Sequence, residues 1–146
     1  MAIVNEMVCF SLYSATRATT RAYTQLLEPW GLTYTQYLVL VVLWSEGEQP
    51  VHALGEALQL DSGTLSPLLR RMEDKDLIVR RRNSADHRLV SVSASGKAQE
   101  LRAELAHIPP TIARGTGLPD MAAARAFIDT LAQLTATMRH IAEAPH

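Results

Sequence analysis

The chain lacks several features that would place it in a large class of proteins. It has one cysteine in 146 residues, so it can form no internal disulfide and no metal site built from several thiolates. Acidic and basic residues nearly balance, and the net charge of −1 gives no overall attraction to nucleic acid. The longest apolar run, residues 37–44, is too short to span a bilayer. We therefore expect neither a disulfide scaffold nor a membrane protein.

Residues 1–6 contain no basic segment followed by an apolar one, so they do not predict a secretory signal peptide. A cytoplasmic protein is expected, in which thiols stay reduced until something oxidises them. The single cysteine is then an inert buried thiol, a reactive thiol, or a link between two chains. A hydrophobic fraction of 47% and a length of 146 residues predict one folded domain.

The N-terminal part of the chain predicts two helices. Residues 6–28 contain no glycine or proline, and Pro29-Trp30-Gly31 is a stop signal. Thr33 and Gln36 then have the spacing of a capping box, so the apolar run that follows is predicted to be a core helix.

The C-terminal part of the chain predicts two more helices. Residues 94–106 predict the first, which is expected to break at Pro109-Pro110, and residues 119–142 predict the last.

The centre of the chain changes from a helical to a strand pattern. Residues 51–58 and 61–75 are two short helical patterns joined by two residues, which is typical of a helix-turn-helix. Residues 77–82 and 88–93 then read as strands around the polar tip 83–87, which predicts a hairpin, or wing. The expected fold is mainly α-helical with a small β-wing.

Basic residues gather in this centre. Seven of the 14 lie between residues 68 and 92 beside four acids, so the stretch is net +3 in a chain that is net −1. The seven are Arg70, Arg71, Lys75, Arg80, Arg81, Arg82 and Arg88. Such a run is often only a solvated charged face. Its combination with a helix pair and a hairpin favours binding to double-stranded DNA.

The expected contacts follow from groove geometry. A helix that opens with hydroxyls can enter the major groove, and an arginine on the hairpin can reach the neighbouring minor groove. The predicted DNA-binding residues are Ser62, Thr64, Ser66, Pro67, Arg70, Arg71, Arg82, Asp86 and Arg88.

The wing carries the sequence DHRLV at 86–90 followed by SASG at 93–96, and in this order of elements it resembles the MarR family of dimeric regulators. Within that family, CFSLYS at 9–14, GLTYTQYL at 31–38 and LDSGTLSPLL at 60–69 resemble the organic-hydroperoxide-resistance repressors, OhrR. The resemblance implies one MarR-like domain over 1–146. Residues 34–93 would form the winged helix-turn-helix, and 6–28 with 94–146 the dimerisation helices.

Cys9 lies near the start of the first predicted helix, where the helix dipole favours a thiolate. Tyr13 is one turn further on and faces the same way. Tyr23 is fourteen residues on, about 21 Å along the axis, so it cannot touch Cys9 of its own chain. In a two-fold dimer with antiparallel first helices it can reach Cys9 of the other chain. Without the resemblance, these tyrosines would be read as core residues.

The OhrR resemblance implies that Tyr23 and Tyr34 of the second subunit hold the Cys9 thiolate and that Tyr13 helps report its oxidation. An organic hydroperoxide would oxidise Cys9 to a sulfenic acid. No second cysteine is present, as in the single-cysteine type, so a small cellular thiol would cap Cys9 or it would be over-oxidised. The homodimer would then release a palindromic operator.

Two other functions remain open. A thiol peroxidase would use Cys9 catalytically, but no second thiol or acid–base pair is evident to complete turnover, so no enzyme is predicted. A MarR-like repressor could instead respond to a small aromatic ligand, with Cys9 structural. The five histidines are scattered, so neither metal nor cofactor is expected. Arg17 and Arg21 are expected to be solvated, paired with acids, or near the DNA backbone.

Overall fold

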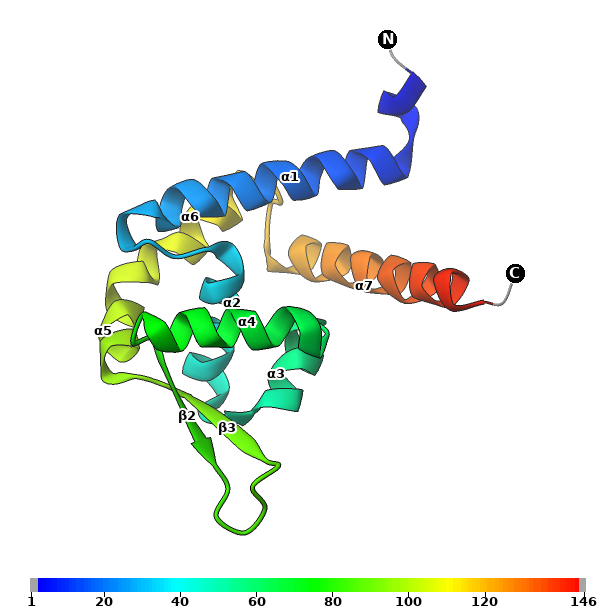
Figure 1. Ribbon diagram of the computed structural model, residues 1–146. Helices are drawn as coiled ribbons and strands as arrows, with labels where there is room; N and C mark the ends of the chain where they lie inside the picture. Colours follow the sequence, from blue (N-terminus) through cyan, green and yellow to red (C-terminus); the bar gives the residue numbers. More distant parts are fainter. Residues whose placement is uncertain (1–2, 145–146) are drawn as a thin grey trace. The chain divides into compact units, whose positions relative to one another are not determined.

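The computed structural model describes residues 3–144 (Figure 1). It divides the chain into two compact units, Met1–Ile108 and Pro109–His146. The first unit holds all the described strands and the helices around them. The single domain expected over residues 1–146 would include both units, and it stays a prediction.

Helix α1 (Val8–Leu27) follows a short 3-10 turn and contains no helix breaker, as its sequence predicts. A second 3-10 turn (Glu28–Trp30) ends it. Gly31 then adopts a left-handed conformation with φ +63°, which glycine alone reaches at little cost. The predicted stop signal is therefore confirmed in its physical detail.

Helix α2 (Tyr34–Glu46) begins at the predicted capping box. Thr33 Oγ1 accepts a hydrogen bond from the Gln36 amide at 3.2 Å, and Gln36 Oε1 accepts one from the Thr33 amide at 3.1 Å. The Val-rich run that follows is helical, and half of its eight residues are buried, because this helix runs through the core. Its identification as a helix rather than a strand is confirmed.

Helices α3 (Val51–Leu58) and α4 (Ser62–Asp74) form the predicted helix-turn-helix pair. Gln59 ends α3 in the left-handed region at φ +56°, which turns the chain sharply before Asp61 caps α4.

Strands β2 (Ile78–Arg82) and β3 (Val90–Ala94) pair antiparallel to form the wing, with Arg80 opposite Val92. Strand β1 (Gln49–Pro50) pairs with the other edge of β3, which gives the order β1-β3-β2. The sequence did not predict β1. It is two residues long and includes a proline, so it has no periodicity of its own, and only the wing makes it a strand.

The first unit continues through α5 (Gly96–Glu104) and a 3-10 turn (Leu105–His107). The predicted break at Pro109-Pro110 is wrong in position. Helix α5 ends before them, at Glu104, and both prolines belong to the first turn of α6 (Ile108–Gly115). First-turn amides have no helical partner, so proline fits there without losing a hydrogen bond.

The core of the first unit lies where α2, α3, α4 and the sheet meet, and it is aliphatic. Its largest fully buried side chains include Leu27, Leu40, Leu54, Leu65, Leu69, Met72, Ile78 and Val92. Among the described residues, no buried side-chain nitrogen or oxygen lacks a hydrogen-bond partner. In the described part of the winged helix, the buried polar side-chain atoms are therefore all hydrogen-bonded.

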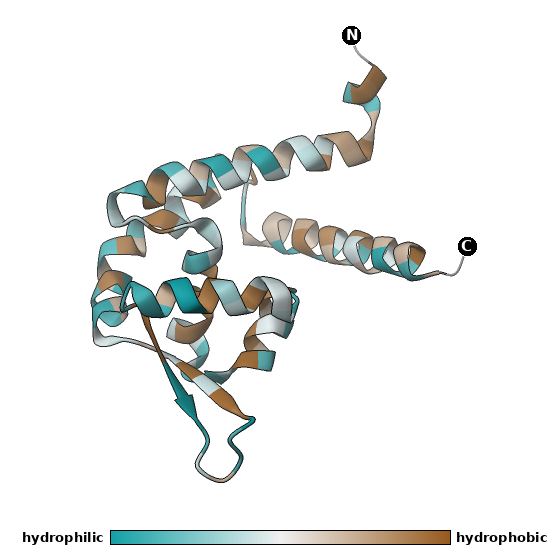
Figure 2. Ribbon diagram, in the orientation of Figure 1, coloured by the Kyte–Doolittle hydropathy of each residue, from teal (hydrophilic) through white to brown (hydrophobic). Residues whose placement is uncertain are grey.

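In the second unit, α7 (Met121–Glu143) is capped by Asp120, whose carboxylate accepts from the Ala123 amide at 2.8 Å. None of its described residues is buried, although hydrophobic and hydrophilic residues mix along its length (Figure 2). Its exposed large apolar side chains are Met121, Phe127, Ile128, Met138 and Ile141. Over residues 3–144, no helix is both long and apolar enough to cross a membrane.

Candidate nucleic-acid interface and thiol site

Helix α4 has one apolar and one polar face. Leu65, Leu68, Leu69 and Met72 are buried at the spacing of a helical stripe, which fixes α4 against the core. The other face is exposed and carries every residue of α4 predicted to contact DNA: Ser62, Thr64, Ser66, Pro67, Arg70 and Arg71. The hydrophobic pattern of α4 therefore turns these side chains outward.

The first turn of α4 is tied by its cap. Asp61 Oδ1 accepts a hydrogen bond from the Thr64 amide at 2.8 Å. Pro67 is the sixth residue of the helix, so the carbonyl of Gly63 has no amide four residues later to bind. The polar face of α4 thus opens with a capped turn followed by a proline in the second turn.

The wing tip is ordered by side chains that bond to its backbone. Asn83 Oδ1 accepts from the Ala85 amide at 2.8 Å, and Asp86 Oδ1 accepts from the Arg88 amide at 3.0 Å. Arg82 Nη1 donates to the His87 carbonyl at 3.4 Å. These bonds hold a short, shaped loop at the end of the two strands.

Arg88 on the wing is far more accessible than Arg80, whose side chain is 33% exposed. The Arg88 side chain is 95% exposed and meets Asp86 only at 3.7 Å. Such a weak surface pair leaves the guanidinium available for another anion.

The predicted basic cluster needs a correction, because Arg80 and Lys75 are held by groups of the same chain outside the wing loop. Arg80 forms a two-pronged ion pair with Glu73, with its Nη2 2.8 Å and its Nε 3.3 Å from the carboxylate. The hydrogen bond from Arg80 holds the pKa of Glu73 below its usual value. Lys75 donates to the Gly31 carbonyl at 2.6 Å. Sequence alone does not separate these cations from the others, since Gly31 is 44 residues from Lys75, and the Arg80–Glu73 pair, seven residues apart, joins β2 to α4.

Cys9 is the second residue of α1, and it is exposed. Met7, the N-cap residue, makes no side-chain hydrogen bond to the first turn of α1. The interpretation of Cys9 as a buried core residue is wrong for the single chain. Its position at the helix start is as the sequence predicts.

The structure brings Tyr23 and Tyr34 together from α1 and α2. Their rings stack with centroids 4.1 Å apart and planes 16° from parallel. Burial, followed by the neighbouring Tyr34 and Tyr37, raises the pKa of Tyr23 to about 12. Burial also raises the pKa of Tyr34, and the hydrogen bond between the two hydroxyls opposes that rise. The pair is therefore neutral near pH 7, and a neutral phenol is a hydrogen-bond donor.

The other two tyrosines differ in their surroundings. Tyr37 is buried and meets Trp44 edge-on at 6.2 Å, so it is part of the core. Tyr13 is 59% exposed, and the Arg17 guanidinium lies 5.5 Å above its ring. Arg17 therefore interacts with an aromatic face, a partner that the sequence analysis did not consider.

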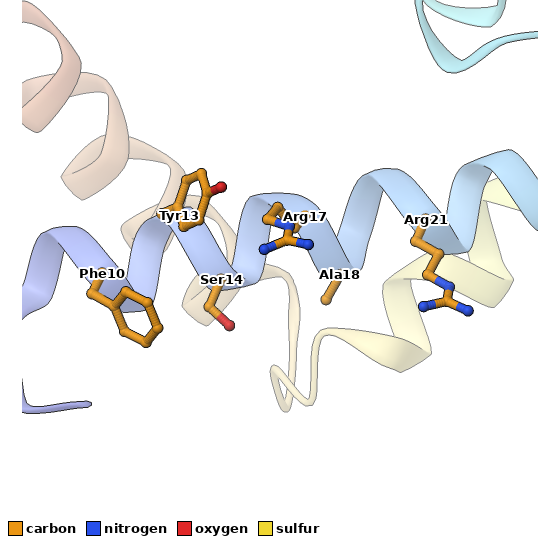
Figure 3. Close-up of a pocket in the computed structure, with 6 residues that line it drawn as sticks. All are labelled: Phe10, Tyr13, Ser14, Arg17, Ala18 and Arg21. Carbon is orange, nitrogen blue, oxygen red and sulfur yellow. The ribbon is translucent and has the colours of Figure 1, made fainter. Parts of the chain in front are cut away.

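A shallow groove of about 300 Å³ runs along α1, and Figure 3 shows its six lining side chains on that helix. They are Phe10, Tyr13, Ser14, Arg17, Ala18 and Arg21. The groove joins an apolar end, beside Cys9 in sequence, to two cations further along the helix. Among residues 3–144, no three histidine, cysteine or acidic side chains gather as metal ligands would.

Comparisons with known proteins agree with this geometry. Residues 21–105 match the family model described as transcriptional regulator SarA/Rot. The organic hydroperoxide resistance transcriptional regulator of Bacillus subtilis is 42% identical over 75% of this chain and 74% of its own length. The HTH-type transcriptional regulator MgrA of Staphylococcus aureus is 40% identical over 79% of both chains.

Among solved structures, AbfR of Staphylococcus epidermidis in its reduced form bound to DNA superposes with a TM-score of 0.76 at 30% identity. The match covers 97% of this chain and 95% of that one. Members of this family regulate transcription and are not enzymes. The chain belongs to the SarA/Rot family of transcriptional regulators, winged-helix proteins of the MarR type.

Proposed function

We propose that this protein is a homodimeric repressor that binds a palindromic operator and releases it when an organic hydroperoxide oxidises Cys9. The observation that carries the proposal is the exposed Cys9 at the start of α1, in a chain whose Tyr23 and Tyr34 form a neutral stacked pair at the other end of that helix.

DNA binding rests on the exposed polar face of α4 and on the wing. The α4 face presents Ser62, Thr64 and Ser66 to the edges of bases in the major groove, while Arg70 and Arg71 are available for phosphates. Arg82, Asp86 and Arg88 lie on the wing, which would follow the backbone into the next minor groove. The AbfR structures with DNA support this use of the fold.

The homodimer is supported by apolar surface that the single chain leaves exposed. Phe127 and Ile128 on α7 are 49% and 54% exposed, and Val8 on α1 is 67% exposed. Exposed apolar side chains on each of two long helices are typical of surfaces that bind a partner. Because most soluble homo-oligomers are two-fold symmetric, one dimer can place Cys9 of each chain near the tyrosine pair of the other.

The proposed chemistry is a two-electron oxidation of sulfur. The Cys9 thiolate attacks the terminal peroxide oxygen, the O–O bond breaks, and with one proton the products are a sulfenic acid and an alcohol. A small cellular thiol then condenses with the sulfenic acid, forming a mixed disulfide and water. The name of the Bacillus subtilis relative supports the inducer, and the reduced, overoxidized and disulfide-formed states in which AbfR has been solved support redox control.

Release follows from geometry. Tyr23 and Tyr34 donate hydrogen bonds to a thiolate better than to a sulfenic acid, and an added thiol needs space between the subunits. Either change would rotate the two winged helices. Because half-sites lie about one helical turn apart, a small change in their spacing abolishes simultaneous binding.

The experiment is anisotropy titration of the DNA upstream of the protein's own gene, before and after addition of cumene hydroperoxide. The wild-type chain is expected to bind DNA when reduced and to release it when oxidised, with mass spectrometry locating the added oxygen on Cys9. Cys9→Ser should bind and ignore the peroxide, and Ser11→Ala is the matched control on the same helix.

Two results would contradict the proposal. If peroxide releases DNA from the Cys9→Ser variant, the sensor lies elsewhere in the protein. If only a small aromatic ligand releases DNA from both the wild type and Cys9→Ser, the protein is a ligand-controlled repressor with a structural cysteine.

A further inference from the structure

Lys75 joins the end of the recognition helix to the junction between α1 and α2. It is the C-cap residue of α4, and its ammonium donates to the Gly31 carbonyl at 2.6 Å and to Gln36 Oε1 at 3.4 Å. Gly31 and Gln36 lie 44 and 39 residues away in sequence. The cation therefore connects two parts of the winged helix that the chain itself does not connect.

The acceptors are built into the start of α2. Gln36 is only 2% exposed, and its Oε1 serves both Lys75 and the Thr33 amide. Gly31 is held in its left-handed conformation by the hydrogen bond that its backbone amide donates to the Glu28 carbonyl at 2.9 Å. A displacement of this junction would therefore be felt directly at the Lys75 ammonium.

The same junction carries the tyrosine pair. Tyr34 is the first residue of α2, between the capping residues Thr33 and Gln36, and it stacks on Tyr23 of α1. Any movement of Tyr34 that follows a change at the thiol moves the first turn of α2. Two residues further along, Gln36 passes that movement to Lys75.

The backbone at the Lys75 end is fixed to the rest of the fold. The Lys75 carbonyl accepts from Lys97 Nζ at 2.9 Å, and the next carbonyl, of Asp76, accepts from Ser95 Oγ at 2.6 Å. Asp76 also adopts a left-handed conformation at φ +58°. The C-terminal end of α4 is thus bonded to the α1–α2 junction and to the start of α5. A shift at this end would tilt the recognition helix.

We infer that Lys75 is a positioning residue that couples the Tyr23–Tyr34 pair to the recognition helix. It does not contact DNA in this role. Its ammonium transmits the position of the α1–α2 junction to the C-terminal end of α4. The inference rests on the proposed role of Tyr34 in sensing, and it predicts that removing the ammonium uncouples the two ends without abolishing DNA binding.

The test is a double-mutant cycle on DNA affinity with Tyr34→Ala and Lys75→Met, which needs no oxidant. Tyr34→Ala is expected to change the Kd at least about fivefold in the wild-type chain and less than about twofold in the Lys75→Met chain. Lys75→Met alone should stay within about threefold of the wild-type Kd. Equal effects of Tyr34→Ala in both chains, or none in either, would overturn the inference.

Two controls separate coupling from general loss of structure. Lys97→Met removes only the bond to the Lys75 carbonyl, so the Tyr34 effect should persist, while Lys75→Arg keeps a cation and should restore it in part. Gln36→Glu keeps the capping acceptor and places a charge opposite Lys75, so it should increase the coupling even if Lys75→Met folds poorly. A smaller coupling in Gln36→Glu would also count against the inference.

A second arm uses cumene hydroperoxide. In Lys75→Met, the ratio of oxidised to reduced Kd should fall at least about fivefold from the wild-type ratio. A wild-type chain that ignores the peroxide would refute the proposed function, and the cycle would still decide whether Lys75 couples the two ends. A wild-type chain that responds, together with an additive cycle, would refute the coupling alone.

Discussion

The winged helix and the long helices that flank it are stabilised in different ways. Helix α4 buries four side chains in 13 residues, whereas α1 buries only Leu27 in 20 residues and α7 buries none in 23. The winged helix therefore obtains its stability from its own chain. The flanking helices keep apolar side chains in solvent, which is unfavourable unless a second chain covers them. The winged helix and the proposed dimer surface are thus formed by separate parts of the sequence.

The sharpest test of this difference compares two aliphatic truncations. Leu69→Ala removes a side chain that is 1% exposed, and we expect the free energy of unfolding to fall by about 3 kcal/mol. Ile128→Ala on α7 removes one that is 54% exposed, and at low protein concentration the loss should be below about 0.5 kcal/mol. Urea unfolding at several protein concentrations measures both.

Concentration dependence separates the two regions further. The Leu69→Ala effect should be the same at every concentration, because it arises inside one chain. The Ile128→Ala effect should grow as concentration rises, because the dimer links stability to mass action. Equal, concentration-independent losses in both variants would show that the flanking helix is packed by its own chain.

The exposed arginines provide a second contrast, with a smaller effect. Arg88→Ala on the wing should weaken operator binding about tenfold and lower the slope of log affinity against log salt by about one. Arg125→Ala on α7 removes an exposed arginine of the same type from a flanking helix, and it should leave both quantities unchanged. Anisotropy titrations at several salt concentrations give both values. The same loss in both variants would mean that total charge, rather than the wing, sets the affinity.

How far the sequence predicted the molecule follows the same division. Local signals decided the elements: Thr33 and Gln36 predicted the start of α2, and Gly31 the end of the preceding turn. Contacts between distant segments were not predictable. Nothing near Lys75 in the chain shows that Gly31 engages it, because that contact exists only after the helices pack. Glu73 is only seven residues from Arg80, but the two pair because α4 packs against β2, which the sequence does not show. The prolines at 109–110 were misplaced because proline both ends helices and begins them.

Within α1, Tyr23 allows the smallest and most specific test. Unfolded Tyr23 ionises near pH 10, whereas in the folded chain burial first, and then Tyr34 and Tyr37, raise its pKa to about 12. Since the folded state keeps this proton longer, its contribution to stability is complete below pH 10 and declines as pH rises from 10 to about 12.

Tyr23→Phe should therefore reduce the loss of unfolding free energy between pH 9 and 12 by about 1 kcal/mol, a value below the full two-unit shift because the ring is only partly buried. Phe10→Leu is the matched control, because Phe10 is an exposed aromatic residue on the same helix without an ionisable group, so its change should leave the alkaline slope unaltered. Urea unfolding at half-unit pH steps measures the slope. If both variants lose stability as steeply as the wild type, Tyr23 is not held neutral by the aromatic pair, and the packed end of α1 is no different from its exposed end.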